Sequence, residues 1–227
     1  VPVRIYHNHS SQFSDTWLKS IRNRFLVFLA LKNATHRISC GQLAGLKIFG
    51  KQSFQILPNA IDIDKYRFSP IFREEIRKEF HIAEHQKVVG MIGILNPFKN
   101  QSFLIEVAKE LPDVTFVFVG EGPDRAILEE KSKEVKNIIF TGKREDVHKF
   151  YSAFDIFAFP SLYEGFPIVL VEAQCSGVDI LMNETIDPTT QIVSELCTAM
   201  PLDKAKWVNY IKKAPIKKKQ RQLNEHL

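Results

Sequence analysis

Short apolar runs alternate with helical patterns between residues 87 and 177, and this alternation constrains the fold more than any other feature of the chain. The runs are rich in Val, Ile and Phe and have the length of buried strands; they lie at 87–93, 114–119, 138–140 and 155–159. Helical patterns separate them near 101–111, 124–135 and 145–152, and another follows the last run. This order predicts an α/β fold with a doubly wound, Rossmann-like parallel sheet covered by helices on both faces.

The residues before this region predict a second, partial Rossmann-like unit. We expect strands at 3–7, 36–40 and 56–62, and a charged helix at 70–81. Six large apolar residues fall on one face of an intervening helix: Trp17, Leu18, Ile21, Phe25, Phe28 and Leu29. Because Lys19, Arg22 and Arg24 are scattered and not gathered on a polar face, we expect a core-facing helix and not a membrane-surface helix.

These patterns predict three parts of the chain. A partial N-terminal domain is expected at 1–62, a main domain at 63–200, and a C-terminal helix with a basic tail at 201–227. The formal net charge of +5 is concentrated in this last part, at Lys212, Lys213, Lys217, Lys218, Lys219 and Arg221. The tail is either a solvated end or a peripheral contact with anionic lipid. Aromatic residues are not interleaved with these lysines, so nucleic-acid binding is not expected.

The 3 cysteines, Cys40, Cys175 and Cys197, are far apart and odd in number. They argue against a disulfide framework and a cysteine-based metal site, and they fit a reducing cytosol. No apolar run reaches the roughly 20 residues that span a bilayer, and no secretory leader pattern opens the chain. We therefore expect a cytoplasmic protein, peripheral on the inner face of the membrane if the tail binds lipid.

The segment 160–177 predicts a ligand site. Pro160 ends an apolar strand, Pro167 suits the first position of a helix, and Gly177 suits its C-terminal stop. Glu164 then lies in the loop at the carboxyl end of the strand and Glu172 inside the helix. In doubly wound sheets ligands bind at that edge, and a helix start favours a phosphate, here at Gly165, Phe166, Pro167 and Ile168. The alternative is that both glutamates are solvated.

Four motifs occur in an order that resembles a known family. The segment from Glu164 resembles the Glu-x7-Glu signature of retaining GT-B glycosyltransferases of the family-4 type (glycosyl transferases group 1). Residues 58–62, Pro-Asn-Ala-Ile-Asp, are similar to its interdomain segment, residues 120–123 to its Gly-x-Gly-Pro turn, and residues 140–142 to a strand end near the nucleotide base. Glu-Gly-Phe-Pro and the later Asn-Glu-Thr-Ile at 183–186 look most like the corresponding segments of capsular and exopolysaccharide enzymes. Compared with such enzymes, this chain looks as if it lacks the front of the N-terminal domain.

The resemblance implies a nucleotide-sugar donor, a UDP-sugar, whose sugar passes with retention to a surface polysaccharide or lipid-linked acceptor. It implies that Glu164 holds sugar hydroxyls, Glu172 the ribose, and His7 the sugar. Lys99 with Gly93 and residues 165–168 would hold the diphosphate, and Thr141 and Gly142 would lie near the base. No metal is required in this scheme, because the helix start and the lysine supply positive charge.

Two positions bear on activity. Lys99 lies in a segment similar to the family's Gly-Arg-x4-Lys loop, but Ile94 occupies the arginine position and offers no charge. Lys99 could also be a solvated loop lysine. His7 and His9 alternate along a strand and therefore point to the same side. There they could act as a metal-binding pair, as catalytic groups or as hydrogen-bonded structural residues. A nucleotide-sugar-binding remnant without transferase activity is therefore the alternative function, and a GT-B-like epimerase is a third.

Overall fold

The computed structural model describes residues 2–9 and 17–216, and the chain forms two compact units. Unit 1 contains Val1–Ala60, Tyr163–Ile168 and Asp187–Thr190, and unit 2 contains Ile61–Leu162, Val169–Ile186 and Gln191–Leu227. Each unit is built around its own parallel sheet. The domain boundaries expected near residues 62 and 200 stay predictions.

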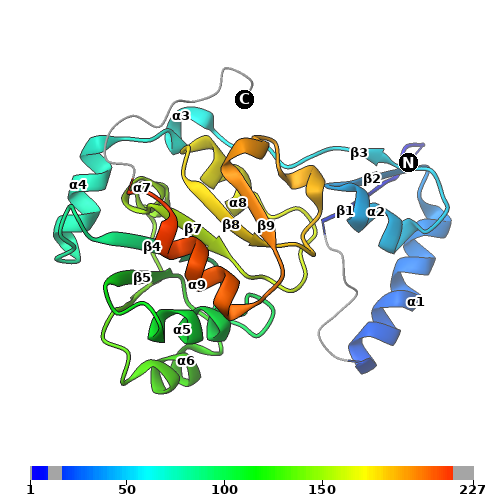
Figure 1. The fold of residues 1–227 in the computed structure, drawn as a ribbon. Coiled ribbons are helices and arrows are strands. Elements are labelled where there is room, and N and C mark those ends of the chain that lie inside the picture. The colour runs from blue at the N-terminus through cyan, green and yellow to red at the C-terminus, as the bar shows by residue number, and fades with distance from the viewer. Residues whose placement is uncertain (1, 10–16, 217–227) are drawn as a thin grey trace. The chain divides into compact units, whose positions relative to one another are not determined.

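Unit 1 is a small β-α-β-α-β arrangement. In chain order its elements are β1 (Ile5–Asn8), α1 (Trp17–Asn33), β2 (His36–Ser39), α2 (Gln42–Phe49) and β3 (Gln55–Ile56) (Figure 1). The three strands are parallel in the order β1-β2-β3. The Phe49 ring on α2 packs edge-on against Tyr6 of β1 at 5.9 Å and contacts Phe54 at 5.4 Å between ring centroids. Aromatic contacts thus hold α2, which the sequence patterns did not predict, against the sheet.

The expectation that α1 packs its large apolar residues into a core is wrong. The helix forms where predicted, but it buries none of its residues. Trp17 is 75% exposed and Phe25 61%. The half-buried face of α1 carries Ser20, Asn23, Val27 and Leu31 instead. A stripe at helical spacing fixes the helix and its apolar face, but it does not say which neighbour that face meets.

Unit 2 contains a six-stranded sheet whose strands are all parallel. Its strands are β4 (Lys87–Ile92), β5 (Val114–Val119), β6 (Ile138–Gly142), β7 (Ile156–Phe159), β8 (Asp179–Asn183) and β9 (Cys197–Met200). Its helices are α3 (Ile63–Tyr66), α4 (Pro70–Glu79), α5 (Gln101–Lys109), α6 (Arg125–Ser132), α7 (Val147–Ala153), α8 (Ile168–Cys175, with Ile168 assigned to unit 1) and α9 (Lys204–Lys213). The doubly wound α/β prediction is confirmed. The apolar runs at β8 and β9 were not recognised as strands.

The strand order is β6-β5-β4-β7-β8-β9. The chain therefore starts in the middle of the sheet at β4, builds outward to β6, returns to pair β7 with β4, and builds outward on the other side. The return between β6 and β7 is a topological switch point, and the loops that leave the carboxyl ends of β4 and β7 are neighbours there. This arrangement selects one edge of the sheet as the place where a ligand would bind.

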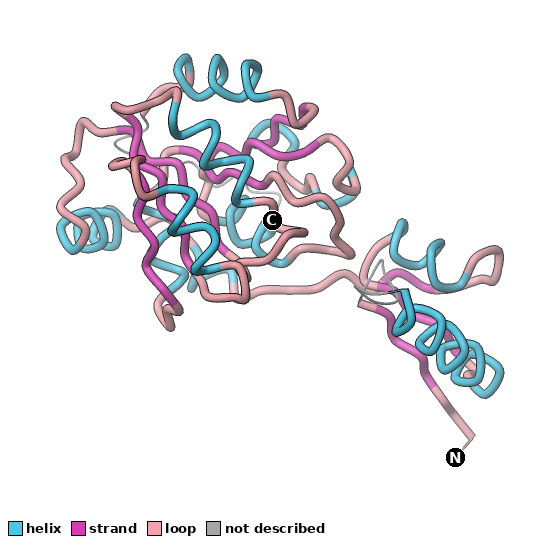
Figure 2. The backbone as a smooth tube through the Cα atoms, turned by 90° about the horizontal axis from the view of Figure 1, so that it is seen from below, coloured by secondary structure: helices cyan, strands magenta, loops and turns pink. Residues whose placement is uncertain are grey.

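Two apolar cores cover the two faces of this sheet, because alternate strand residues point to opposite sides. Val88 and Ile92 of β4 pack with residues of α4, α7 and α8, whereas Val89 and Met91 pack with residues of α5 and α9. Figure 2 shows the strands of the sheet in magenta with helices on either side. Trp207 of α9 is fully buried and meets Phe103 edge-on at 5.1 Å.

The C-terminal helix predicted beyond residue 200 is α9, which ends at Lys212 and Lys213. The remaining tail residues expected to contact lipid, from Lys217 to Arg221, lie outside the described residues, so that contact stays a prediction. Among residues 2–9 and 17–216, no helix combines the length and apolar character needed to cross a bilayer.

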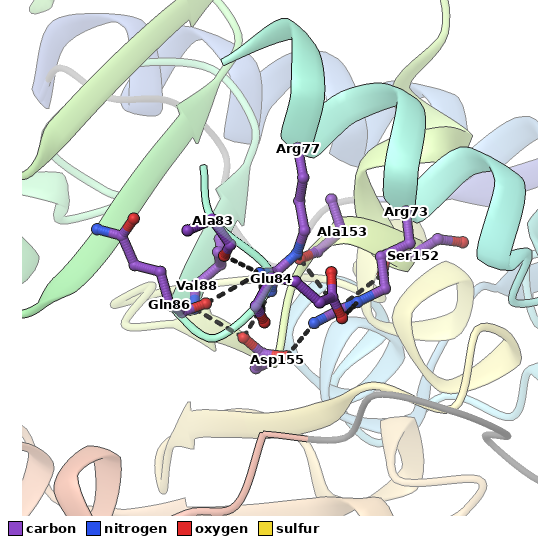
Figure 3. A network of polar contacts seen from close by, with 9 residues as sticks. All are labelled: Arg73, Arg77, Ala83, Glu84, Gln86, Val88, Ser152, Ala153 and Asp155. Carbon is purple, nitrogen blue, oxygen red and sulfur yellow. Dashed lines mark hydrogen bonds and ion pairs between the residues drawn. The ribbon is translucent and has the colours of Figure 1, made fainter. Parts of the chain in front are cut away.

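A buried ionic network joins β7, β4 and α4 at the amino end of the sheet (Figure 3). Asp155 is fully buried, and its Oδ1 accepts a hydrogen bond from Arg73 Nη2 at 3.1 Å. Its Oδ2 accepts from Arg77 Nη2 and from the backbone N–H of Val88, both at 2.8 Å. Burial lowers the pKa of Arg77, and the charge of Asp155 opposes that shift. One carboxylate thus ties two strands and a helix together.

We expect Asp155→Asn to lower the free energy of unfolding by about 3–5 kcal/mol, because it leaves the buried guanidinium of Arg77 without an ion pair and Arg73 with only the half-exposed Glu84. Glu84→Gln is the matched control. Glu84 also pairs with Arg73, at 3.1 Å, but its side chain is 54% exposed, so its loss should cost about 1 kcal/mol or less. Urea unfolding followed by far-UV circular dichroism measures both, and equal losses in the two variants would contradict the role given to Asp155.

Candidate functional site

The loop after β4 brings two predicted residues together. Gly93 has a φ of +154°, a conformation that side chains rarely adopt, and its N–H donates to Val119 O at 3.0 Å. A Cβ at Gly93 would lie 3.4 Å from Lys99 Cε, so the lysine chain runs directly beside this glycine. Lys99 Nζ lies 5.1 Å from the centre of the Phe159 ring, a cation–π distance. Lys99 is therefore held by its loop and by the end of β7.

Hydrogen bonds join the loops that follow β4 and β7. The N–H of Leu162 donates to Phe98 O at 2.8 Å, and Asn100 Nδ2 donates to Pro160 O at 3.4 Å. Asn183 Nδ2, at the end of β8, donates to Ser161 O at 3.0 Å. The strand order predicted adjacent loops at the switch point, and these bonds show that the two loops are in contact.

Ile94 follows Gly93 in the same loop and is 57% exposed. Its carbonyl accepts a hydrogen bond from Gln101 Nε2 at 2.9 Å, so the start of α5 fixes the backbone of the loop. The side chain at the position where the resemblance expects arginine is therefore apolar and open to solvent. It supplies no charge to a phosphate group.

The turn after β5 packs backbone against backbone. A Cβ at Gly120 would lie 2.1 Å from Gly93 O, and one at Gly122 would lie 2.2 Å from Leu95 O, so only glycine fits at either position. The N–H of Gly120 donates to Gly142 O at 3.0 Å. A tight turn therefore accounts for the Gly-x-Gly motif. It places three predicted residues, Gly93, Thr141 and Gly142, along one edge of the sheet.

Glu172 lies in α8 and is 9% exposed. Its Oε2 accepts a hydrogen bond of 2.5 Å from the hydroxyl of Tyr151, which is fully buried. Burial raises the pKa of Tyr66, and the hydrogen-bonding influence and the charge of Glu172 raise it further, so Tyr66 also lies near this carboxylate. No lysine, arginine or histidine of the described chain forms an ion pair with Glu172. The two tyrosines had no signal in the sequence, because they approach Glu172 from other helices.

The remaining predicted residues belong to unit 1. Glu164 is half-buried, and the loop around it lies beside the start of α2, where a Cβ at Gly41 would be 3.4 Å from Gly165 O. Asn59 Nδ2 donates to Phe166 O at 3.1 Å. The interdomain motif is thus in contact with the Glu-Gly-Phe-Pro loop. Pro167 has no N–H and α8 begins at Ile168, so the helix start offers fewer donors than the prediction assumed.

His7 and His9 both lie at the end of β1, and their ring centroids are 4.1 Å apart. Slight burial and the neighbouring His9 lower the pKa of His7. Within residues 2–9 and 17–216, no three His, Cys, Asp or Glu side chains gather as a metal site would require. The catalytic role of His7 stays a prediction.

We expect the stability of the protein to fall between about pH 10 and pH 12 through Tyr66. Burial, together with the hydrogen bond and the charge of Glu172, raises the pKa of Tyr66 from 10.0 to about 12. A raised folded-state pKa stabilises the protein fully below the unfolded pKa, and this contribution is lost as the pH rises through the folded pKa. Urea unfolding at pH 9 to 12 should show that the free energy of unfolding falls less steeply with pH in Tyr66→Phe than in the unmodified protein. Glu172→Gln keeps the phenol of Tyr66 but removes the charge beside it. Its free energy of unfolding should therefore fall with a slope between those of the unmodified protein and Tyr66→Phe. Identical slopes in all three proteins would refute the assignment.

The chain was compared with known proteins. Residues 72–222 match the family model described as "Glycosyl transferases group 1". EpsF of Bacillus subtilis (strain 168), provisionally named a glycosyltransferase, is 31% identical over 94% of this chain and 60% of its own length. The UDP-Gal:alpha-D-GlcNAc-diphosphoundecaprenol alpha-1,3-galactosyltransferase of Escherichia coli is 29% identical over 81% of this chain and 52% of its own.

Solved structures give the same fold. The crystal structure of Anabaena Alr3699/HepE in complex with UDP-glucose superimposes with a TM-score of 0.79 at 26% identity, over 92% of this chain and 61% of that one. The C-terminal domain of LpcC, a glycosyl transferase group 1 family protein of Francisella tularensis, superimposes with a TM-score of 0.56 at 24% identity, over 67% of this chain and 86% of that one. The chain spans about 60% of the length of its first curated relative. Because the family model covers more than half of its residues, the chain belongs to the glycosyl transferases group 1 family.

Proposed function

We propose that unit 2 binds the nucleoside diphosphate of a UDP-sugar at the switch point of its sheet. The observation that carries the proposal is the pair of joined loops after β4 and β7, which hold Lys99 next to the half-buried backbone of Gly93. A flexible ammonium group beside a glycine backbone can meet a diphosphate, because neither a Cβ nor a bulky side chain blocks the approach.

We further propose that the whole protein transfers the sugar to a surface polysaccharide or lipid-linked acceptor with retention at the anomeric carbon. In this reaction an acceptor hydroxyl replaces the nucleotide, and the departing UDP gains negative charge. Positive charge at the diphosphate stabilises that change, and Lys99 is the group we assign to it. The scheme includes no metal ion and assigns the positive charge at the diphosphate to Lys99.

The other roles follow from the family resemblance. Glu164 is assigned to the hydroxyls of the transferred sugar, Glu172 to the ribose, and His7 to the sugar from the N-terminal part. Thr141 and Gly142 are assigned to the neighbourhood of the base. The Escherichia coli relative is named for a UDP-galactose donor and a diphosphoundecaprenol acceptor, and the HepE structure contains UDP-glucose. Both names support a UDP donor, and the first supports a lipid-linked acceptor.

A second candidate function is donor binding without transfer. The exposed, uncharged Ile94 favours it, because a guanidinium at this position would offer paired donors to the diphosphate and isoleucine offers none. This candidate predicts that the chain binds UDP but transfers no sugar from UDP-sugars to acceptor glycans.

We expect calorimetric titration with UDP, GDP, ADP and CMP to show selective binding of UDP. Lys99→Ala should weaken UDP binding by about tenfold or more, because it removes a charge-assisted contact to phosphate. Lys109→Ala is the matched control, since Lys109 lies in the last turn of the same helix-loop segment and is 44% exposed. Equal affinities of the two variants, or no binding of any nucleotide by the unmodified chain, would overturn the proposal.

We also expect Ile94→Arg to strengthen binding of UDP more than binding of uridine. The new guanidinium can reach phosphate oxygens but gains nothing from a nucleoside that carries none. Because Ile94 is exposed, the substitution should leave the melting temperature nearly unchanged. Ile94→Lys controls for charge alone and should give a smaller gain. An equal effect of Ile94→Arg on UDP and uridine would show that residue 94 does not face the diphosphate.

A further inference from the structure

Two carboxylates are buried in the described part of unit 2, and they are held by different donors. Asp155 is paired with two arginines, whereas Glu172 accepts a hydrogen bond from the hydroxyl of Tyr151, lies near Tyr66, and has no ion pair among the described residues. A buried carboxylate without a cation is costly, and hydroxyl donors offset only part of that cost. Such an arrangement is typical of a functional site, where the charge is kept available for a ligand.

The two tyrosines are held independently of Glu172. The Tyr151 ring on α7 packs against Phe157 at 5.5 Å and Phe154 at 6.4 Å between centroids. The Tyr66 ring, at the end of α3, lies edge-on to Tyr151 at 6.0 Å and to His148 at 6.5 Å. Their hydroxyl positions are therefore set by the aromatic core. A hydroxyl fixed in this way can orient a flexible glutamate side chain.

An ionised carboxylate only accepts hydrogen bonds, and its two oxygens offer about four acceptor positions. Tyr151 takes one position on Oε2, and Tyr66 lies near enough for the Glu172 carboxylate to raise its pKa. The remaining positions can accept from other donors, and 9% of the Glu172 surface stays exposed, whereas Asp155 is 1% exposed. A neighbouring pair of sugar hydroxyls has the matching chemistry, because both can donate to one carboxylate.

We propose that Tyr151 and Tyr66 are positioning residues that hold the Glu172 carboxylate for the ribose hydroxyls of the nucleotide, and so make the site select ribonucleotides over deoxyribonucleotides. This inference rests on the proposed function, since it needs a nucleotide in unit 2. It adds that recognition of the ribose depends on hydroxyls supplied by α7 and α3 as well as on α8. Replacing these tyrosines with phenylalanine keeps the Glu172 carboxylate but removes the hydroxyls that hold its orientation.

The test is a comparison of the dissociation constants of UDP and 2′-deoxy-UDP by calorimetry. The unmodified protein should prefer UDP by about tenfold or more, because a hydrogen bond to a charged acceptor is lost with the deoxy ligand. Tyr151→Phe keeps the ring and loses only the hydroxyl, and it should reduce this preference to about threefold or less by weakening UDP binding alone. Tyr66→Phe should act in the same direction, and Glu172→Gln should remove most of the preference.

Tyr210→Phe is the matched control. Tyr210 on α9 also uses its hydroxyl in a part-buried side-chain hydrogen bond, accepting from Thr198 Oγ1 at 3.2 Å, but no hydrogen bond joins it to Glu172. This variant should keep the full preference for UDP. Melting temperatures of all variants separate a loss of stability from a loss of selectivity. If Tyr151→Phe does not fold, Tyr66→Phe, whose ring is only half-buried, carries the test.

The outcomes separate the two proposals. If the unmodified protein binds UDP in preference to 2′-deoxy-UDP and both tyrosine variants keep that ratio, the tyrosines are structural and this inference alone is overturned. If the unmodified protein binds UDP and 2′-deoxy-UDP equally, Glu172 does not contact the ribose 2′-hydroxyl and the inference also fails. If the protein binds no nucleotide, the proposed function fails and the inference fails with it.

Discussion

The pairing of β4 with β7 is the constraint on which the rest of unit 2 depends, and Asp155 secures it. The carboxylate receives the N–H of Val88 on β4, and the backbone N–H of Asp155 itself donates to Val88 O at 2.8 Å. Two arginines of α4 complete the neutralisation of its charge. This network lies at the amino ends of the strands, so it fixes the strand order without occupying the edge where a ligand would bind. The switch point at the carboxyl ends follows from that order.

At the opposite edge the structure depends on close backbone contacts. Gly120 and Gly122 lie against the carbonyls of Gly93 and Leu95, at distances that no side chain permits. These contacts, with the hydrogen bond from Gly120 to Gly142, bring the ends of β4, β5 and β6 close together. Lys99 of the β4 loop lies beside the backbone of Gly93. Glycines here allow one chain segment to approach another closely.

The two buried carboxylates of the described part of unit 2 are held by different kinds of donor. Asp155 accepts three hydrogen bonds from guanidinium and amide donors and is fully buried, which gives a stable joint. Glu172 is held by phenol hydroxyls, which orient a carboxylate but do not cancel its charge. Ion pairing suits a structural joint, and hydroxyl donors suit a group that has to accept a further hydrogen bond.

The sequence by itself determined the α/β class, the parallel sheet of unit 2 and the position of Glu172 in a helix. It did so because the period of apolar residues and the Pro and Gly positions are local properties. It also predicted α1 as a helix, but its prediction that the apolar stripe faces a core was wrong. The strand order, the contact between the β4 and β7 loops, and the two tyrosines at Glu172 were decided by the tertiary structure alone. Each joins residues far apart in the chain, so no local pattern records the pairing.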